Sequence, residues 1–90
     1  MSNQRTFATS DFYLAALLMA NRLRIVELDR SNPRRVRFVF EDSPIRKCLV
    51  VEFLNSEATV NAQAFIAAIR HLKRILYAPV ENENGDIDTG

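Results

Sequence analysis

An uninterrupted apolar run over residues 12–20 constrains the fold of this chain more than any other feature. Its nine side chains carry no polar group except the phenol of Tyr13. A helix on the surface of a globular protein normally turns a polar face toward water, and this run has almost none. It is also far shorter than the ~20 residues that cross a bilayer. We therefore expect a helix enclosed within a folded domain, and no membrane partner.

The chain has 90 residues, which suffice for one small domain with a modest core. We predict a flexible lead over residues 1–8, a single folded domain over residues 9–78 and a disordered tail over residues 79–90. The tail holds four acidic and no basic side chains, and few apolar ones. Residues 1–78 hold all 12 Lys and Arg against seven acidic side chains, so their net charge is +5.

Cysteine content and charge indicate the compartment. Cys48 is the only cysteine, so no internal disulfide forms, and a reducing compartment is expected. A signal peptide carries positive charge before its apolar core. Here Asp11 directly precedes the apolar run, and Arg5 is the only upstream basic side chain. We expect a cytoplasmic protein.

Local signals at both ends predict a helix over the apolar run. Thr9, Ser10 and Asp11 offer side chains that can cap its N-terminus. Asn21 follows the run and suits the left-handed conformation that ends many helices. We expect this helix to be covered partly by the rest of its own chain and partly by a second copy.

Two segments rich in β-branched and aromatic residues, 24–30 and 34–40, flank the sequence Ser-Asn-Pro and predict a β-hairpin. Charge favours the register in which Glu27 faces Arg37 and Asp29 faces Arg35. The opposite face of this hairpin is apolar and needs helices to cover it. It consists of Val26, Leu28, Val36, Phe38 and Phe40.

Two further helices complete the predicted fold. Ser43 as N-cap and Pro44 at the first helical position start one of them, although the β-branched content of residues 48–54 also allows a strand there. Asn61 is a suitable N-cap for the last helix, and Pro79 ends it. We predict a small single α+β domain of order α-β-β-α-α, in which a two-stranded antiparallel hairpin packs against three helices. The apolar face of the last helix consists of Phe65, Ala68, Ile69, Leu72 and Leu76.

Four segments of the sequence resemble a known family. They read TSDFYLAALLMA, VRFVFEDSP, NSEATVNAQAF and AIRHLKRILY, and they occur in this order over residues 9–77. They are similar to short bacterial and phage proteins catalogued only as a domain of unknown function. The resemblance implies a helix and not a strand over residues 45–54. It implies no activity, so it assigns no functional residue.

Residues suited to catalysis are scarce. His71 is the only histidine, and a catalytic function would require a second acid, base or nucleophile beside it. Cys48 could supply one, but a structural thiol and a histidine at the border of a helix face are the commoner interpretations. No His, Cys and carboxylate cluster has metal-ligand spacing, and both glycines lie in the tail, so no phosphate-binding loop exists. We expect no enzyme, no cofactor and no metal.

Arginines support nucleic-acid binding as one function. Six of them lie between residues 22 and 37, and arginine suits phosphate contacts. In the predicted register Arg35 and Arg37 are paired with acids. Five basic side chains have no acidic partner in this register and are the candidate phosphate contacts: Arg30, Arg34, Arg70, Lys73 and Arg74.

Apolar helix faces support self-association as the other function. Residues 12–20 and 45–54 are apolar nearly all round, and a 90-residue domain cannot surround both segments. Exposed apolar stripes mark partner surfaces, and a symmetric homodimer is the commonest solution. We expect a non-enzymatic binding or assembly module that forms a homodimer through these faces. In the alternative, the module binds nucleic acid through its arginines. Its partners besides a second copy are then nucleic acid or another protein. The candidate interface residues are Phe12, Ala16, Met19, Val50 and Leu54.

Overall fold

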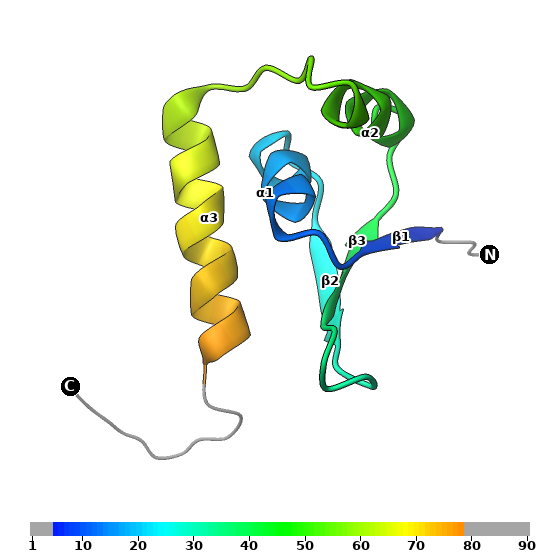
Figure 1. The fold of residues 1–90 in the computed structure, drawn as a ribbon, viewed down its shortest axis with the longest axis vertical. Helices are drawn as coiled ribbons and strands as arrows, with labels where there is room; N and C mark the ends of the chain where they lie inside the picture. The colour runs from blue at the N-terminus through cyan, green and yellow to red at the C-terminus, as the bar shows by residue number, and fades with distance from the viewer. Residues whose placement is uncertain (1–4, 79–90) are drawn as a thin grey trace.

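The computed structural model describes residues 5–78, which form an α+β domain (Figure 1). Three helices pack with a three-stranded antiparallel sheet whose strand order is β1-β3-β2. Small size and α+β class are as predicted, whereas the element order and the number of strands differ. The elements are β1 (Thr6–Thr9), α1 (Phe12–Ala20), β2 (Ile25–Asp29), β3 (Arg37–Glu41), α2 (Arg46–Leu54) and α3 (Ala62–Tyr77).

Strand β1 corrects the predicted flexible lead at residues 6–8, whereas residues 1–4 lie outside the described residues. It pairs with β3 so that Phe7 lies opposite Phe40 and Thr9 opposite Phe38. The predicted two-stranded hairpin is therefore one half of a larger sheet, with β3 in the centre. A strand of four residues is too short to show a hydrophobic period, and its partner lies some 30 residues away, so local patterns did not reveal it. The predicted tail, residues 79–90, lies outside the described residues.

The predicted register of the hairpin is wrong. Leu28 lies opposite Phe38 and Asp29 opposite Arg37, and an irregularity between Ile25 and Glu27 shifts the pairing. The irregularity allows Ile25 and Leu28 to pack against the core although three positions separate them, and it leaves Val26 50% exposed. Burying an Ile or Leu side chain contributes about 1.5–3 kcal/mol. A cross-strand charge pair contributes roughly 0.2–1 kcal/mol, so burial decides the register.

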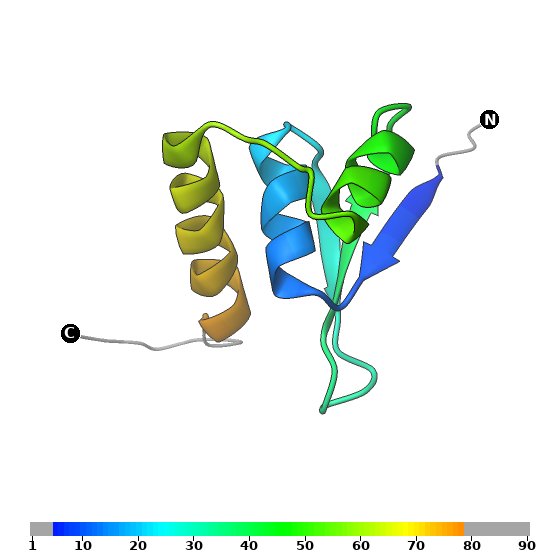
Figure 2. The same ribbon diagram turned by 45° about the horizontal axis from the view of Figure 1, so that its top comes forward.

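Helix α1 is the centre of the domain. Its Asp11 cap accepts hydrogen bonds from the backbone N–H groups of Tyr13 and Leu14, both at 3.0 Å. The five residues Leu14–Leu18 are all buried, in one core with Phe38, Phe40, Ala68 and Leu72. Figures 1 and 2 show α1 between α3 on one side and the sheet and α2 on the other. The rest of the chain thus covers most of the apolar run, so a second copy is not needed to bury it.

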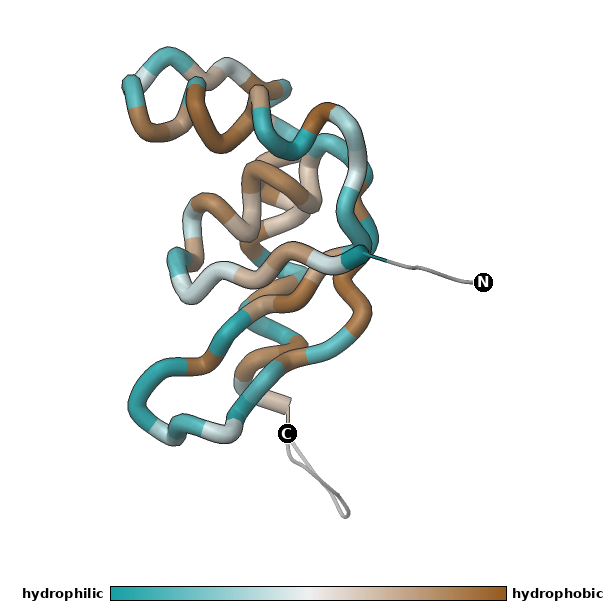
Figure 3. Tube along the Cα trace, turned by 90° about the vertical axis from the view of Figure 1, so that its right-hand side faces the viewer, coloured by the Kyte–Doolittle hydropathy of each residue, from teal (hydrophilic) through white to brown (hydrophobic). Residues whose placement is uncertain are grey.

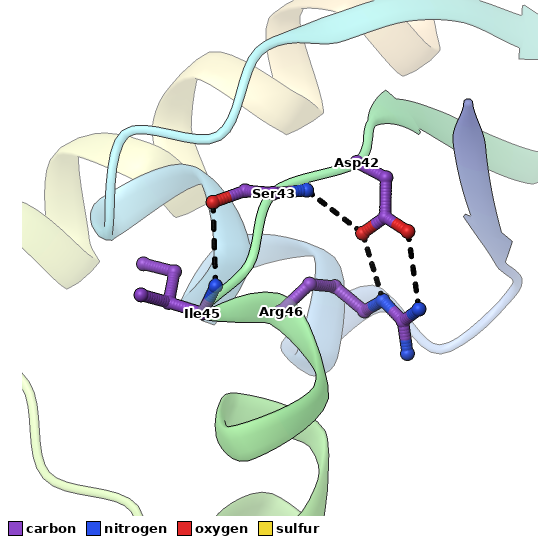
Figure 4. Close-up of polar contacts among 4 residues, drawn as sticks. All are labelled: Asp42, Ser43, Ile45 and Arg46. Atoms are coloured by element: carbon purple, nitrogen blue, oxygen red, sulfur yellow. Dashed lines mark hydrogen bonds and ion pairs between the residues drawn. The ribbon is translucent and has the colours of Figure 1, made fainter. Parts of the chain in front are cut away.

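Helix α2 is the one described helix without a buried residue. It settles the alternative of helix or strand over residues 48–54 in favour of helix, and it begins at Arg46 because Pro44 and Ile45 form a preceding turn. Arg46 holds it to the sheet by donating two hydrogen bonds to Asp42, from Nε to Oδ1 at 2.9 Å and from Nη2 to Oδ2 at 3.1 Å (Figure 4). The same guanidinium lies 4.4 Å from the centre of the Phe7 ring. No residue of α2 is fully buried.

Helix α3 matches its prediction. The Asn61 side chain accepts a hydrogen bond from the backbone N–H of Ala64 at 2.9 Å. Ala68 and Leu72 are buried against the core, and the other residues of the predicted apolar face are half-buried around them. Figure 3 shows that hydrophilic residues gather at the hairpin tip between β2 and β3.

Candidate anion-binding groove

An open hollow of about 720 Å³ lies between the C-terminal end of α1, the start of β2 and the side of α3. We call it the groove. Its floor is apolar and its rim is basic. The floor consists of Met19, Ala20, Leu23, Ile25, Ala64, Ala67 and Ala68, and the rim of Arg24, Arg70, His71 and Arg74.

Helix α3 supplies one wall of the groove because of its residue spacing. Arg70 and His71 lie three and four positions after Ala67, and Arg74 lies four and three positions after them, which places all four residues along one side of the helix. The alanines leave room that longer side chains would fill. Lys73 lies about 60° around the helix axis from Arg70, on the side away from Ala67, and is not part of the groove.

The turn that ends α1 supplies the opposite wall. Arg22 has φ 72°, in the left-handed region, and Leu23 donates its backbone N–H to the Leu18 carbonyl at 3.1 Å. Asn21, predicted to be left-handed, has φ −97° and caps the helix through its side chain instead. The turn buries Leu23 beneath the groove and brings Arg24 to its rim. The Arg24 carbonyl accepts a hydrogen bond from Glu41 at 2.8 Å, which fixes this wall to β3.

Charge in the groove is of one sign. No carboxylate of residues 5–78 lines it, and α3 contains no acidic residue. Within residues 5–78 the one ion pair joins Arg46 to Asp42, so none of the groove arginines has a described carboxylate within 4.0 Å. Uncompensated cations around an apolar hollow attract anions and concentrate them there. The groove can therefore bind a ligand that carries both negative charge and an apolar surface.

The five predicted phosphate contacts lie at different places. Arg70 and Arg74 belong to the groove, and Lys73 does not. Arg30 donates from Nη2 to the Leu76 carbonyl at 3.1 Å, so it ties the hairpin to the end of α3. Arg34 lines a hollow of about 400 Å³ together with Leu76.

Arg35 and Arg37 are not paired as predicted. Arg37 lies opposite Asp29 and not Glu27, and Arg35 precedes β3. The pKa of Asp29 is lowered mainly by hydrogen bonds from Ser31, whose hydroxyl lies 2.7 Å away, and only slightly by the charge of Arg37. Both arginines line a polar hollow of about 380 Å³ with Ser31 and neighbouring residues.

The sequence did not identify two of the groove residues, Arg24 and His71, as candidate contacts. Arg24 was counted in the arginine cluster but not among the candidate contacts, because its position depends on the turn at Arg22. His71 was interpreted as a border residue of α3, and it is exposed at the rim. Its position directly after Arg70, near two alanines, is the signal that could have identified it.

The predicted interface residues differ in exposure. Ala16 is fully buried within the domain, so it cannot contact a partner. Phe12, Met19 and Val50 are half-buried and pack against the chain's own core, where the Phe12 and Phe38 rings meet edge to face at 6.1 Å. Leu54 is 73% exposed, on the outside of α2.

Cys48 lies on α2 and outside the groove. Its thiol is 3.6 Å from a carboxylate oxygen of Glu52. The negative charge of Glu52 raises the pKa of Cys48, which disfavours the nucleophilic thiolate.

Within residues 5–78, no group of three His, Cys, Asp or Glu side chains could hold a metal ion. None of the helices there has the length and apolar character of a membrane span.

The profile of one protein family matches residues 4–78, and its description is "Domain of unknown function (DUF5659)". The chain belongs to this family. The match confirms the resemblance inferred from the four sequence segments and extends it across β1 of this DUF5659 domain. No curated protein and no solved structure matches the chain. The proposal of a function for the DUF5659 domain therefore depends on the groove and on the exposed surfaces.

Proposed function

We propose that this DUF5659 domain is a non-enzymatic module that binds nucleic acid through the groove. One observation carries the proposal: Arg24, Arg70 and Arg74 surround a single open hollow that no carboxylate of the described part of the chain lines. Nucleic-acid phosphates are the anions that arginine contacts best, because its planar guanidinium matches them with two hydrogen bonds.

The distribution of charge supports a polymeric anion. Ten of the 12 basic residues are arginines, and residues 1–78 carry a net charge of +5. Arg70 and Arg74 are separated by about 6 Å along the helix axis, so they can contact successive groups of one chain. Arg24 faces the ligand from the other wall. A polymer that follows the groove would contact all three.

The test compares two neighbouring residues of α3. Arg74→Ala removes a charge from the groove, and Lys73→Ala removes one from a different side of the same helix. We expect Arg74→Ala to weaken the binding of short oligonucleotides in fluorescence anisotropy. It should also reduce the slope of log K against log salt by about 0.9 on duplex DNA, or about 0.7 on single strands. Lys73→Ala, the matched control, should change the slope little.

Two results would contradict this function. Failure of the wild-type protein to bind any oligonucleotide at micromolar concentration and low salt would remove it. Equal losses in Arg74→Ala and Lys73→Ala would show attraction by net charge alone and no use of the groove.

Self-association through α2 is a second candidate, favoured by the exposure of Val51 and Leu54 on its outer side. The partner is a second copy, because a two-fold contact presents the same patch from both chains. A nine-residue helix is only about 13 Å long, so the patch covers less than the roughly 800 Å² per partner of stable complexes. We therefore expect a weak dimer whose population depends on concentration.

Light scattering across a concentration series tests the dimer. Leu54→Gln should lower the apparent mass at high concentration, whereas Ile66→Gln, which changes an exposed residue of α3, should not. A wild-type mass equal to that of a monomer at every concentration would end this candidate.

The exposed free thiol of Cys48 supports our placement of the module in a reducing compartment such as the cytoplasm.

A further inference from the structure

We infer that the groove binds single-stranded nucleic acid, with one unstacked base on the apolar floor between the arginines. This inference rests on the proposed nucleic-acid function and specifies its ligand. The floor contains seven apolar side chains and lies directly between basic walls. The ligand must therefore present an apolar surface next to its phosphates.

A duplex does not have that surface. Its bases are stacked and paired inside, so its outer surface along the backbone is charged and polar. Placed across the groove, a duplex would contact the rim and leave the floor unfilled. A single strand can turn a base out of its stack, and each base carries a flat, weakly polar face beside a phosphate. Only the single strand uses both parts of the groove.

The groove has room for a base and a composition that suits one. Its open volume of about 720 Å³ lies within the range of pockets that hold small organic ligands, so a base fits with space left over. Ala64 and Ala67 form one side of the floor, and half-buried Met19, which is flexible, lies on the α1 side. The floor has no side-chain amide or hydroxyl group to read the edge of a base. We expect binding that tolerates any sequence.

Arginine completes the contact. A guanidinium plane can stack on a base as well as bind a phosphate. Arg70 and Arg74 are both exposed at the rim and have no described acidic partner, so they are free to do either. His71 is the one aromatic side chain among the described residues that line the groove, so stacking on His71 and arginine, with packing on alanine, would supply the base contact.

The key variant is Ala67→Leu. Ala67 is exposed on α3 and lines the groove, so leucine would fill the floor without changing any charge. Leucine forms helix nearly as well as alanine, so the fold should persist. Ala62→Leu is the matched control, because Ala62 is also exposed on α3 but lies outside the groove. Equal melting temperatures of both variants would verify that they are folded.

Fluorescence anisotropy would compare three probes of equal length at one low salt concentration: a single strand, a duplex and an abasic strand that retains its phosphates. We expect the wild-type protein to bind the single strand about tenfold more tightly than the abasic strand. Ala67→Leu should remove that difference and leave duplex binding unchanged, whereas Ala62→Leu should behave as wild type.

The failure of this inference is distinct from the failure of the proposed function. Equal affinity for the single, abasic and duplex probes would overturn the base contact and retain binding through phosphates. An Ala67→Leu variant that keeps the preference for the single strand would also overturn it. Absence of binding to all three probes would overturn both proposals.

Discussion

At the scale of single residues, two non-glycine residues within positions 5–78 hold the left-handed conformation. Arg22 after α1 has φ 72° and Ser56 after α2 has φ 57°. In both turns an asparagine precedes them and donates its side-chain N–H to a carbonyl four residues back, at 2.9 Å for Asn21 and 3.1 Å for Asn55. The asparagine thus caps the helix, and the residue after it adopts the unfavourable backbone conformation.

Glycine at these positions should stabilise the domain. The left-handed conformation costs a residue with a Cβ roughly 1–2 kcal/mol, and glycine loses part of that gain through its greater freedom in the unfolded state. We expect Arg22→Gly to raise the free energy of unfolding in urea by about 0.5–1 kcal/mol. Asn21→Gly, the control, should lower it, because φ is negative there and the side-chain hydrogen bond is lost. Stabilisation of similar size by Asn21→Gly would contradict this account.

The Asp42–Arg46 pair should make stability depend on pH. The hydrogen bonds from Arg46 hold the pKa of Asp42 below its usual value near 3.8. A carboxyl group with a lowered pKa in the folded state stabilises that state above its unfolded pKa, and this stabilisation is lost as pH falls through the folded value. Asp42→Asn should therefore cost roughly 1 kcal/mol at pH 7, as partly exposed pairs do. The difference from wild type should vanish in strong acid. Thermal unfolding at both pH values measures it, and a constant difference would refute the assignment.

At the scale of elements, the sequence predicts what depends on neighbouring residues. The caps Asp11 and Asn61 lie within three residues of the groups that they bind, and the apolar face of α3 is a local repeat. The pairing of β1 and the shift in β2 depend on residues far away in the chain, so local patterns do not determine them. The groove follows the same rule. Arg70 and Arg74 could be identified on one helix, and Arg24 could not, because only the fold brings it opposite them.

Strand β1 should contribute measurably to stability, in contrast to the flexible lead that the sequence suggested. Phe7 is half-buried, packs against the core and lies beneath the guanidinium of Arg46. Phe7→Ala should lower the free energy of unfolding by about 2 kcal/mol, somewhat less than for a fully buried ring. Thr6→Ala, at an exposed position of the same strand, should change it by less than about 0.5 kcal/mol. Chemical denaturation of both variants measures these free energies of unfolding. Equal small effects would show that β1 contributes little to stability.

At the scale of the whole molecule, the charges of the two parts of the chain oppose each other. Residues 1–78 carry a net charge of +5, and the four acids of residues 79–90 bring the total to +1. These acids are Glu81, Glu83, Asp86 and Asp88. Carboxylates covalently linked to a basic domain compete with phosphates for the same cations. The competition is electrostatic, so it should weaken as the screening length falls from about 10 Å at 0.1 M salt to about 3 Å at 1 M.

Removal of residues 80–90 should therefore tighten oligonucleotide binding at low salt and change it little at high salt. A second variant of full length, with the four acids changed to Gln or Asn, separates charge from bulk. If charge is the cause, both variants should bind more tightly to the same extent in fluorescence anisotropy. If the bulk of the segment blocks the ligand, only the shortened chain should bind more tightly. Equal affinities of both variants and the wild-type protein at low salt would show that these acids do not act on the groove at all.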